Sequence, residues 1–133
     1  MVVEDDDDLR ELFVELLRQD GWHAHGVADS SAARAAIGTI APDVFVLDFN
    51  LAGETTEGLL GELTSLPSPP AAVLVSAAEA ARVVAARHGV PLISKPFDAD
   101  ELLVLVQAAR ARASIGRATR RWLIFPPSML ASA

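Results

Sequence analysis

The chain alternates short apolar runs with amphipathic segments of helical period, and this alternation restricts its fold more than any single motif does. Helices are predicted where apolar residues recur at three- and four-residue spacing, namely over 6–19, 30–37, 59–66, 78–88 and after Asp98. Strands are predicted over Met1–Val3, Trp22–Val27, Val44–Leu47, Ala71–Val75 and Val90–Ile93. Such a strand–helix repeat forms a parallel sheet with helices on both faces. We therefore predict an α/β fold, a doubly wound five-stranded parallel sheet.

Charge divides the chain near residue 112. All 18 acidic residues lie within 1–112, whereas 113–133 contain three arginines and no acid. The helical period also ends near this point. We predict a folded domain over 1–112 and a C-terminal tail over 113–133. The tail is either disordered or a docking segment, since four consecutive large apolar residues at 122–125 are costly to expose.

Composition argues against several functional classes. The formal net charge of −7 disfavours nucleic acid as the partner, because phosphate binding needs clustered lysine and arginine. The absence of cysteine excludes disulfides and thiol chemistry. No apolar run is long enough to span a membrane, and the chain opens with acidic residues rather than a signal peptide. We expect a cytoplasmic location with no membrane partner.

Polar residues follow four of the five predicted strands: Glu4 and Asp5, then Asp48 and Asn50, then Ser76, then Lys95. Because parallel strands end at one edge of the sheet, we expect these groups to converge at the point where strand order reverses. Converging carboxylates repel one another unless a cation lies among them, and oxygen ligands without histidine or cysteine favour Mg²⁺. A metal, a lysine and a hydroxyl around one nucleophilic carboxylate are the parts that phosphoryl transfer requires.

Four motifs, in this order along the chain, resemble the receiver domains of bacterial response regulators in two-component signalling. They are Val2–Asp5, Pro42–Asp48, Val73–Ala77 and Lys95–Phe97, and the resemblance covers about residues 1–112. It implies a flavodoxin-like (βα)5 fold with strand order 2-1-3-4-5.

The resemblance also implies a role for each residue at the strand ends. Asp48 would accept the phosphoryl group. Mg²⁺ would be held by Asp48, by Glu4 and Asp5, and by the backbone carbonyl of Asn50. Ser76 and Lys95 would each contact a phosphoryl oxygen, and the Lys95–Pro96 peptide bond would be cis.

By the same resemblance, the chain is a phosphorelay response regulator. It would take the phosphoryl group from a phosphohistidine on a sensor histidine kinase or a histidine phosphotransfer protein. It would then signal by conformational change to a downstream protein target. The sequence leaves open whether the protein forms a homodimer. It would catalyse its own phosphorylation and hydrolysis without turning over a separate substrate, so we do not class it as an enzyme.

Four features depart from the family pattern. The first predicted strand has only three residues before Glu4, and no output domain is expected after the fifth predicted helix. Leu92 stands where the family usually carries a tyrosine or phenylalanine that turns inward on activation, which predicts weaker coupling to a partner. The segment after Asp48 is longer than usual, with Thr55 and Thr56 expected in the extra length.

Two alternatives remain open from the sequence. The first is a receiver-like interaction module that is not phosphorylated. Leu92 and the short first strand favour it, and the complete set of Asp5, Asp48, Ser76 and Lys95 disfavours it. The second is a phosphatase with an aspartyl nucleophile. Such enzymes use a second aspartate two residues after the nucleophile as general acid, and here that position is Asn50.

Overall fold

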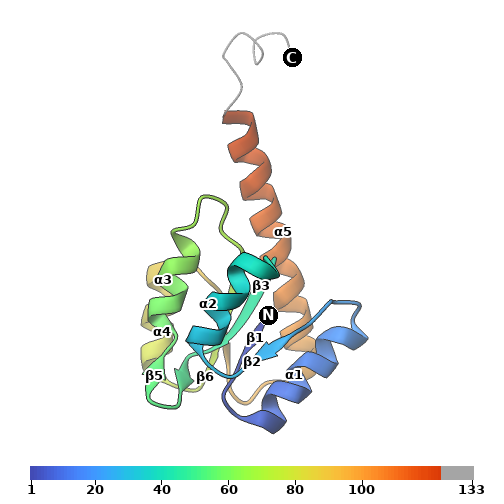
Figure 1. Ribbon diagram of the computed structural model, residues 1–133, viewed down its shortest axis with the longest axis vertical. Helices are drawn as coiled ribbons and strands as arrows, with labels where there is room; N and C mark the ends of the chain where they lie inside the picture. Colours follow the sequence, from blue (N-terminus) through green and yellow to red (C-terminus); the bar gives the residue numbers. More distant parts are fainter. Residues whose placement is uncertain (124–133) are drawn as a thin grey trace.

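The computed structural model describes the backbone of residues 1–123 and the side chains of residues 1–115. Its strands are β1 (Val2–Val3), β2 (Gly26–Val27), β3 (Val44–Asp48), β4 (Asn50–Leu51), β5 (Glu54–Thr55), β6 (Ala71–Ser76) and β7 (Leu92–Ser94). Its helices are α1 (Asp7–Gln19), α2 (Ser30–Thr39), α3 (Glu57–Thr64), α4 (Glu79–His88) and α5 (Ala99–Leu123). Figure 1 shows their arrangement.

The main sheet is parallel throughout and has the order β2-β1-β3-β6-β7 in the described part of the chain. This is the order 2-1-3-4-5 when only the parallel strands are numbered, so the predicted fold and strand order are confirmed. Among the described residues, no helix combines the length and the apolar character needed to cross a membrane.

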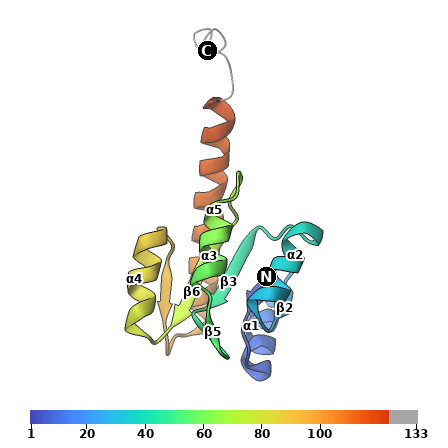
Figure 2. The same cartoon turned by 60° about the vertical axis from the view of Figure 1, so that its left-hand side comes forward.

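Helices cover both faces of the sheet and enclose two apolar clusters. Side chains alternate along each strand, so neighbouring residues such as Val2 and Val3 enter opposite clusters. One cluster packs the sheet against α2, α3 and α4, and the other packs it against α1 and α5. Figure 2 shows α4 to the left of the strands and α1 and α2 to the right. The central strands β3 and β6 are buried along their whole length, as their continuous apolar runs predict.

Side-chain caps begin three of the helices. The carboxylates of Asp6, Asp29 and Asp98 accept hydrogen bonds from backbone N–H groups three residues later, at distances of 2.7 to 2.9 Å. These bonds satisfy N–H groups that have no partner within the helix. Aspartate is a typical residue for this capping position, because its short side chain reaches those N–H groups.

β2 is shorter than predicted, because we expected a strand over Trp22–Val27. Its neighbour β1 begins at Val2, which pairs with Gly26, and the Val2 N–H donates to the carbonyl of His25 at 2.8 Å. Residues 22–24 precede this pairing, so they lead into β2 without a partner strand among the described residues. The difference arises from the length of β1 and not from the propensity of residues 22–25.

Two features differ from prediction beyond β2. The segment after β3 contains an antiparallel hairpin, in which β4 and β5 are joined by Ala52 and Gly53, the latter at a φ of 76°. In addition, α5 continues to Leu123, so the prediction that the helical segment ends near residue 112 is wrong. Figure 1 shows the end of α5 projecting from the rest of the fold. The apolar run at 122–125 lies largely outside the described residues.

Candidate functional site

The predicted site residues come together at the carboxyl-terminal edge of the main sheet. Glu4 and Asp5 follow β1, Asp48 ends β3, and Ser76 ends β6. Lys95 follows β7, and its N–H donates to the Ser76 carbonyl at 3.0 Å. Strand register thus places groups from four separate segments at one edge, as the sequence predicts.

Three carboxyl groups form the acidic part of this edge. One oxygen from each of Glu4, Asp5 and Asp48 lies within 4.8 Å of the other two. Glu4 and Asp48 are buried, whereas Asp5 is exposed. Oxygen ligands at this spacing, open to solvent on one side, suit a hard divalent cation that keeps several waters.

Glu4 lies in surroundings that disfavour a negative charge on its carboxyl group. It is only 2% exposed, and its Oε2 has no hydrogen-bond partner among the described residues. Burial, followed by the hydrogen bond and negative charge of Asp48, raises the pKa of Glu4 to about 8. A buried carboxyl oxygen without a partner fits a cation that is bound beside it.

Lys95 supplies the positive charge beside the acidic cluster. Its Nζ lies 3.5 Å from Oδ1 of Asp48, and its side chain is 31% exposed. The Lys95–Pro96 peptide bond is cis, as predicted. The ammonium is therefore close enough to pair with a negatively charged group carried by Asp48.

Ser76 is buried next to this pair, one residue beyond Val75, which lies opposite Asp48 in the sheet. Its Oγ accepts a hydrogen bond from the Ala78 N–H at 2.9 Å, at the start of α4. A hydroxyl that accepts one bond still has its own hydrogen to donate. Ser76 thus has a donor available without giving up its contact with α4.

Asn50 lies at the rim of the site in the hairpin, with its side chain exposed. It pairs with Thr55, and the next pair is bonded through the Thr56 N–H and the Phe49 carbonyl at 2.9 Å. Bonded and non-bonded pairs alternate in an antiparallel ladder, so the Asn50 carbonyl points away from Thr55. The Asn50 carbonyl, which the family resemblance assigns to the metal, is therefore not used in hydrogen bonding between the two strands of the hairpin.

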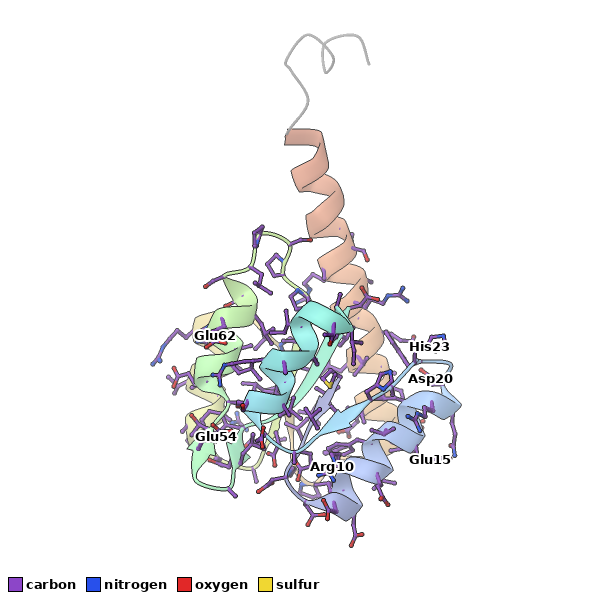
Figure 3. All side chains as sticks on the ribbon, in the orientation of Figure 1. Arg10, Glu15, Asp20, His23, Glu54 and Glu62 are labelled. Carbon is purple, nitrogen blue, oxygen red and sulfur yellow. The ribbon has the colours of Figure 1, made fainter. Side chains whose placement is uncertain are left out.

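The hairpin also connects the acidic cluster to α2. At its tip, the Ala52 N–H donates to Oδ2 of Asp5 at 2.9 Å. On its other strand, Glu54 accepts a hydrogen bond from the Ser30 N–H at 3.1 Å, and Figure 3 shows Glu54 near the start of α2. Asp5 is thereby held in place by a segment whose secondary structure the sequence analysis did not predict.

Thr56 is a site residue whose role sequence reasoning missed. It is fully buried, and its hydroxyl donates to the main-chain carbonyl of Asp48 at 3.0 Å. This carbonyl faces the β1 side of the sheet, where β1 has already ended at Val3. Thr56 satisfies it instead. The available signal was a threonine at the end of the long segment after Asp48, directly before an apolar helix.

Comparison with known families gives one match over most of the chain. The profile of the response regulator receiver domain matches residues 1–107. This range contains every residue of the edge described above.

The curated relatives include the nitrogen assimilation regulatory protein NtrX of Azorhizobium caulinodans. It is 29% identical over 127 residues, which cover 90% of this chain and 28% of that protein. The sensory transduction protein RegX3 of Mycobacterium tuberculosis is 30% identical over 115 residues, which cover 84% of this chain and 50% of that protein. The chain therefore spans half or less of the length of these relatives.

Solved structures agree with the profile. The receiver domain of NtrX from Brucella abortus superimposes with a TM-score of 0.75 at 31% identity, covering 83% of this chain and 96% of that one. NtrX from the same organism in complex with ATP gives a TM-score of 0.81 at 30% identity, covering 90% of this chain and 28% of that one.

Proposed function

Because the chain belongs to the response regulator receiver domain family, we propose that Asp48 is its phosphoryl acceptor and that Glu4, Asp5 and Asp48 hold Mg²⁺ for the transfer. Members of this family act as signalling modules of two-component systems rather than as classical enzymes. The observation that carries the proposal is the juxtaposition of three carboxyl groups within 4.8 Å of one another and a lysine 3.5 Å from one of them.

Asp48 suits the role of nucleophile because its environment restricts it. The carboxylate is buried at the end of a fully buried strand, and Thr56 fixes the adjacent main-chain carbonyl. An Asp48 oxygen would attack the phosphorus of a phosphohistidine, forming a P–O bond as the P–N bond breaks. The imidazole leaves with the electron pair of the broken bond and regains a proton. The product is an aspartyl phosphate on this chain.

The remaining groups would bind the charge that develops. Mg²⁺, when bound, would neutralise the carboxylates and the phosphoryl oxygens. The Asn50 carbonyl would supply a further ligand. The Lys95 ammonium would pair with one phosphoryl oxygen, and the free hydroxyl hydrogen of Ser76 would donate to another. Ser76 also contacts the start of α4, so a shift toward the phosphoryl group would be transmitted to that helix.

The partners follow from this chemistry. The donor would be a phosphohistidine on a sensor histidine kinase or a phosphotransfer protein, and the output would be a change in contacts with a downstream protein. Leu92 is partly buried and packs against the cluster beneath α2, α3 and α4. Leucine is smaller than tyrosine or phenylalanine, so its contacts would change less on phosphorylation. We therefore expect a small conformational change at this position.

The test is intact mass spectrometry after incubation with Mg²⁺ and a small acyl phosphate. We expect wild type to gain one phosphoryl group, and Asp48→Asn to gain none. Asp43→Asn is the matched control, because Asp43 precedes the opposite end of the same strand and should leave the modification unchanged. If the wild type binds no Mg²⁺ and gains no mass from acyl phosphate or phosphohistidine donors, the proposal fails. The non-phosphorylated interaction module would then replace it.

A further inference from the structure

The hairpin formed by β4 and β5 lies between the acidic edge and the start of α2, and its base is held firmly. Thr56, the residue after β5, is fully buried. Its N–H donates to the Phe49 carbonyl at 2.9 Å, and its hydroxyl donates to the Asp48 carbonyl at 3.0 Å. Because these two bonds close the base of a short hairpin, its tip and its second strand form one unit.

The tip of the hairpin restricts a proposed metal ligand. The Ala52 N–H donates to Oδ2 of Asp5 at 2.9 Å. The Asp5 side chain is exposed, so without this bond it would be free to change rotamer. A carboxylate has about four lone-pair positions, so Asp5 can accept the bond from Ala52 and still bind a cation. The bond therefore orients the carboxylate without using its capacity for a metal.

The second strand of the hairpin is attached to α2 through Glu54. The Glu54 carboxylate accepts a hydrogen bond from the Ser30 N–H at 3.1 Å. Ser30 is the first residue of α2, so its N–H has no partner within the helix. Ser30 is only 1% exposed, and loss of this bond would leave a buried N–H unpaired. The charge of Glu54 is also favourable at this end of a helix, because of the helix dipole.

A cation at the acidic edge would act on both ends of this connection. It would fix the Asp5 carboxylate, which accepts the bond from Ala52 at the tip. The Asn50 carbonyl, the further proposed ligand, belongs to β4 of the same hairpin. Coupling between two sites is reciprocal, so a hairpin that strengthens cation binding is itself held more firmly when the cation is bound.

We propose that the hairpin is a clasp that couples the metal site to α2: the Ala52 N–H positions Asp5 for Mg²⁺, and Glu54 transmits the presence of the ion to Ser30. The clasp rests on the proposed function, because it takes Asp5 as a ligand of Mg²⁺. It gives the acidic edge a connection to α2 in addition to the one that Ser76 makes with the start of α4.

The first part of the test compares Ala52→Pro with Ala52→Ser. Ala52 has a negative φ and Gly53 a φ of 76°, and the first position of such a turn accepts proline. Proline lacks the N–H that donates to Asp5, whereas serine keeps it, and neither substitution changes the net charge. We expect calorimetry to show Mg²⁺ binding that is about tenfold weaker in Ala52→Pro than in Ala52→Ser, as is typical when the partner of a metal ligand is removed.

The second part measures amide hydrogen exchange with and without Mg²⁺, and in wild type it needs no variant. Exchange at Ser30 should slow by about fivefold or more when Mg²⁺ is saturating. Ala32 is the internal control, because its N–H donates to Asp29 at 2.7 Å in the same turn of α2 and not to the hairpin. Exchange at Ala32 should stay unchanged, and the effect of Mg²⁺ at Ser30 should disappear in Ala52→Pro.

Equal Mg²⁺ affinities of Ala52→Pro and Ala52→Ser, beside normal binding by wild type, would overturn the clasp and leave the proposed function intact. Exchange at Ser30 that ignores Mg²⁺, or that slows together with Ala32, would overturn the transmission to α2. A wild type that binds no Mg²⁺ would overturn the proposed metal site and the clasp together.

Discussion

Replacing Thr56 by valine tests whether the main chain of the acceptor is held by a side chain outside the sheet. Valine has nearly the same shape as threonine but lacks the hydroxyl. The Thr56 hydroxyl is fully buried and lies 3.0 Å from the Asp48 carbonyl. Because β1 ends at Val3, the substitution leaves that buried carbonyl without its donor.

The expected loss in the free energy of unfolding is about 1–3 kcal/mol, the cost of leaving a buried polar group unpaired. Thr39→Val is the matched control. The Thr39 hydroxyl contacts the Ala35 carbonyl at 3.3 Å on an exposed helix surface, so we expect a change within about 0.5 kcal/mol. Urea denaturation followed by circular dichroism measures both values, with the slope showing whether unfolding stays two-state.

The same substitution should slow phosphorylation by acyl phosphate, because the acceptor carboxylate would lose part of its positional restraint. Equal stability of the Thr56→Val and Thr39→Val proteins would refute the argument that Thr56 holds the acceptor strand. A large loss of stability with an unchanged phosphorylation rate would refute its functional part alone.

Three further predictions follow from contacts at or near the site. Because its pKa is raised to about 8, Glu4 keeps its proton at neutral pH in the metal-free folded protein. The contribution of this proton to the free energy of unfolding is lost as the pH rises through about 8. Glu4→Gln should therefore gain stability relative to wild type as the pH rises from about 5 to about 8 in metal-free thermal melts, because only the folded wild type holds the proton in this range. A difference that stays constant over this range would contradict the prediction. Lys95→Gln should bind Mg²⁺ more tightly, because the substitution removes a positive charge 3.5 Å from Asp48, yet it should be phosphorylated more slowly. Calorimetry measures Mg²⁺ binding, and intact mass measures phosphorylation. If Mg²⁺ affinity and phosphorylation rate changed in the same direction, the role assigned to Lys95 would be contradicted. Gly26→Ala would place a Cβ 2.7 Å from Cγ of Arg10, so urea denaturation should show a loss of about 1–3 kcal/mol, and an unchanged midpoint would contradict the close packing.

Much of the fold could be predicted because local and tertiary signals agree along most of the chain. The buried run at Val44–Leu47 suits a central strand, and Asp29 and Asp98 begin helices whose apolar faces repeat with helical period. The residues at the carboxyl ends of the strands then follow from parallel topology alone. For this reason the sequence alone predicts that Glu4, Asp48 and Lys95 lie together.

The features that were not predicted depend on tertiary partners or on weak local preferences. The hairpin at Asn50–Thr55 has few strand-forming residues and is held by contacts from Asp5 and Ser30, which lie far away in sequence. β2 is short because its neighbour supplies only two paired residues. α5 continues past residue 112 because alanine and arginine favour helix, although the charge of the sequence changes there.

The most direct test of the central claim is to locate the phosphoryl group on the chain. Phosphorylated protein would be reduced with borohydride, which converts an aspartyl phosphate to homoserine, and then digested and sequenced by mass spectrometry. The proposed chemistry predicts homoserine at position 48 only, dependent on Mg²⁺ and absent from Asp48→Asn. Homoserine at Asp5 or another carboxylate, or phosphorylation that survives in Asp48→Asn, would contradict the assignment of Asp48 as the acceptor.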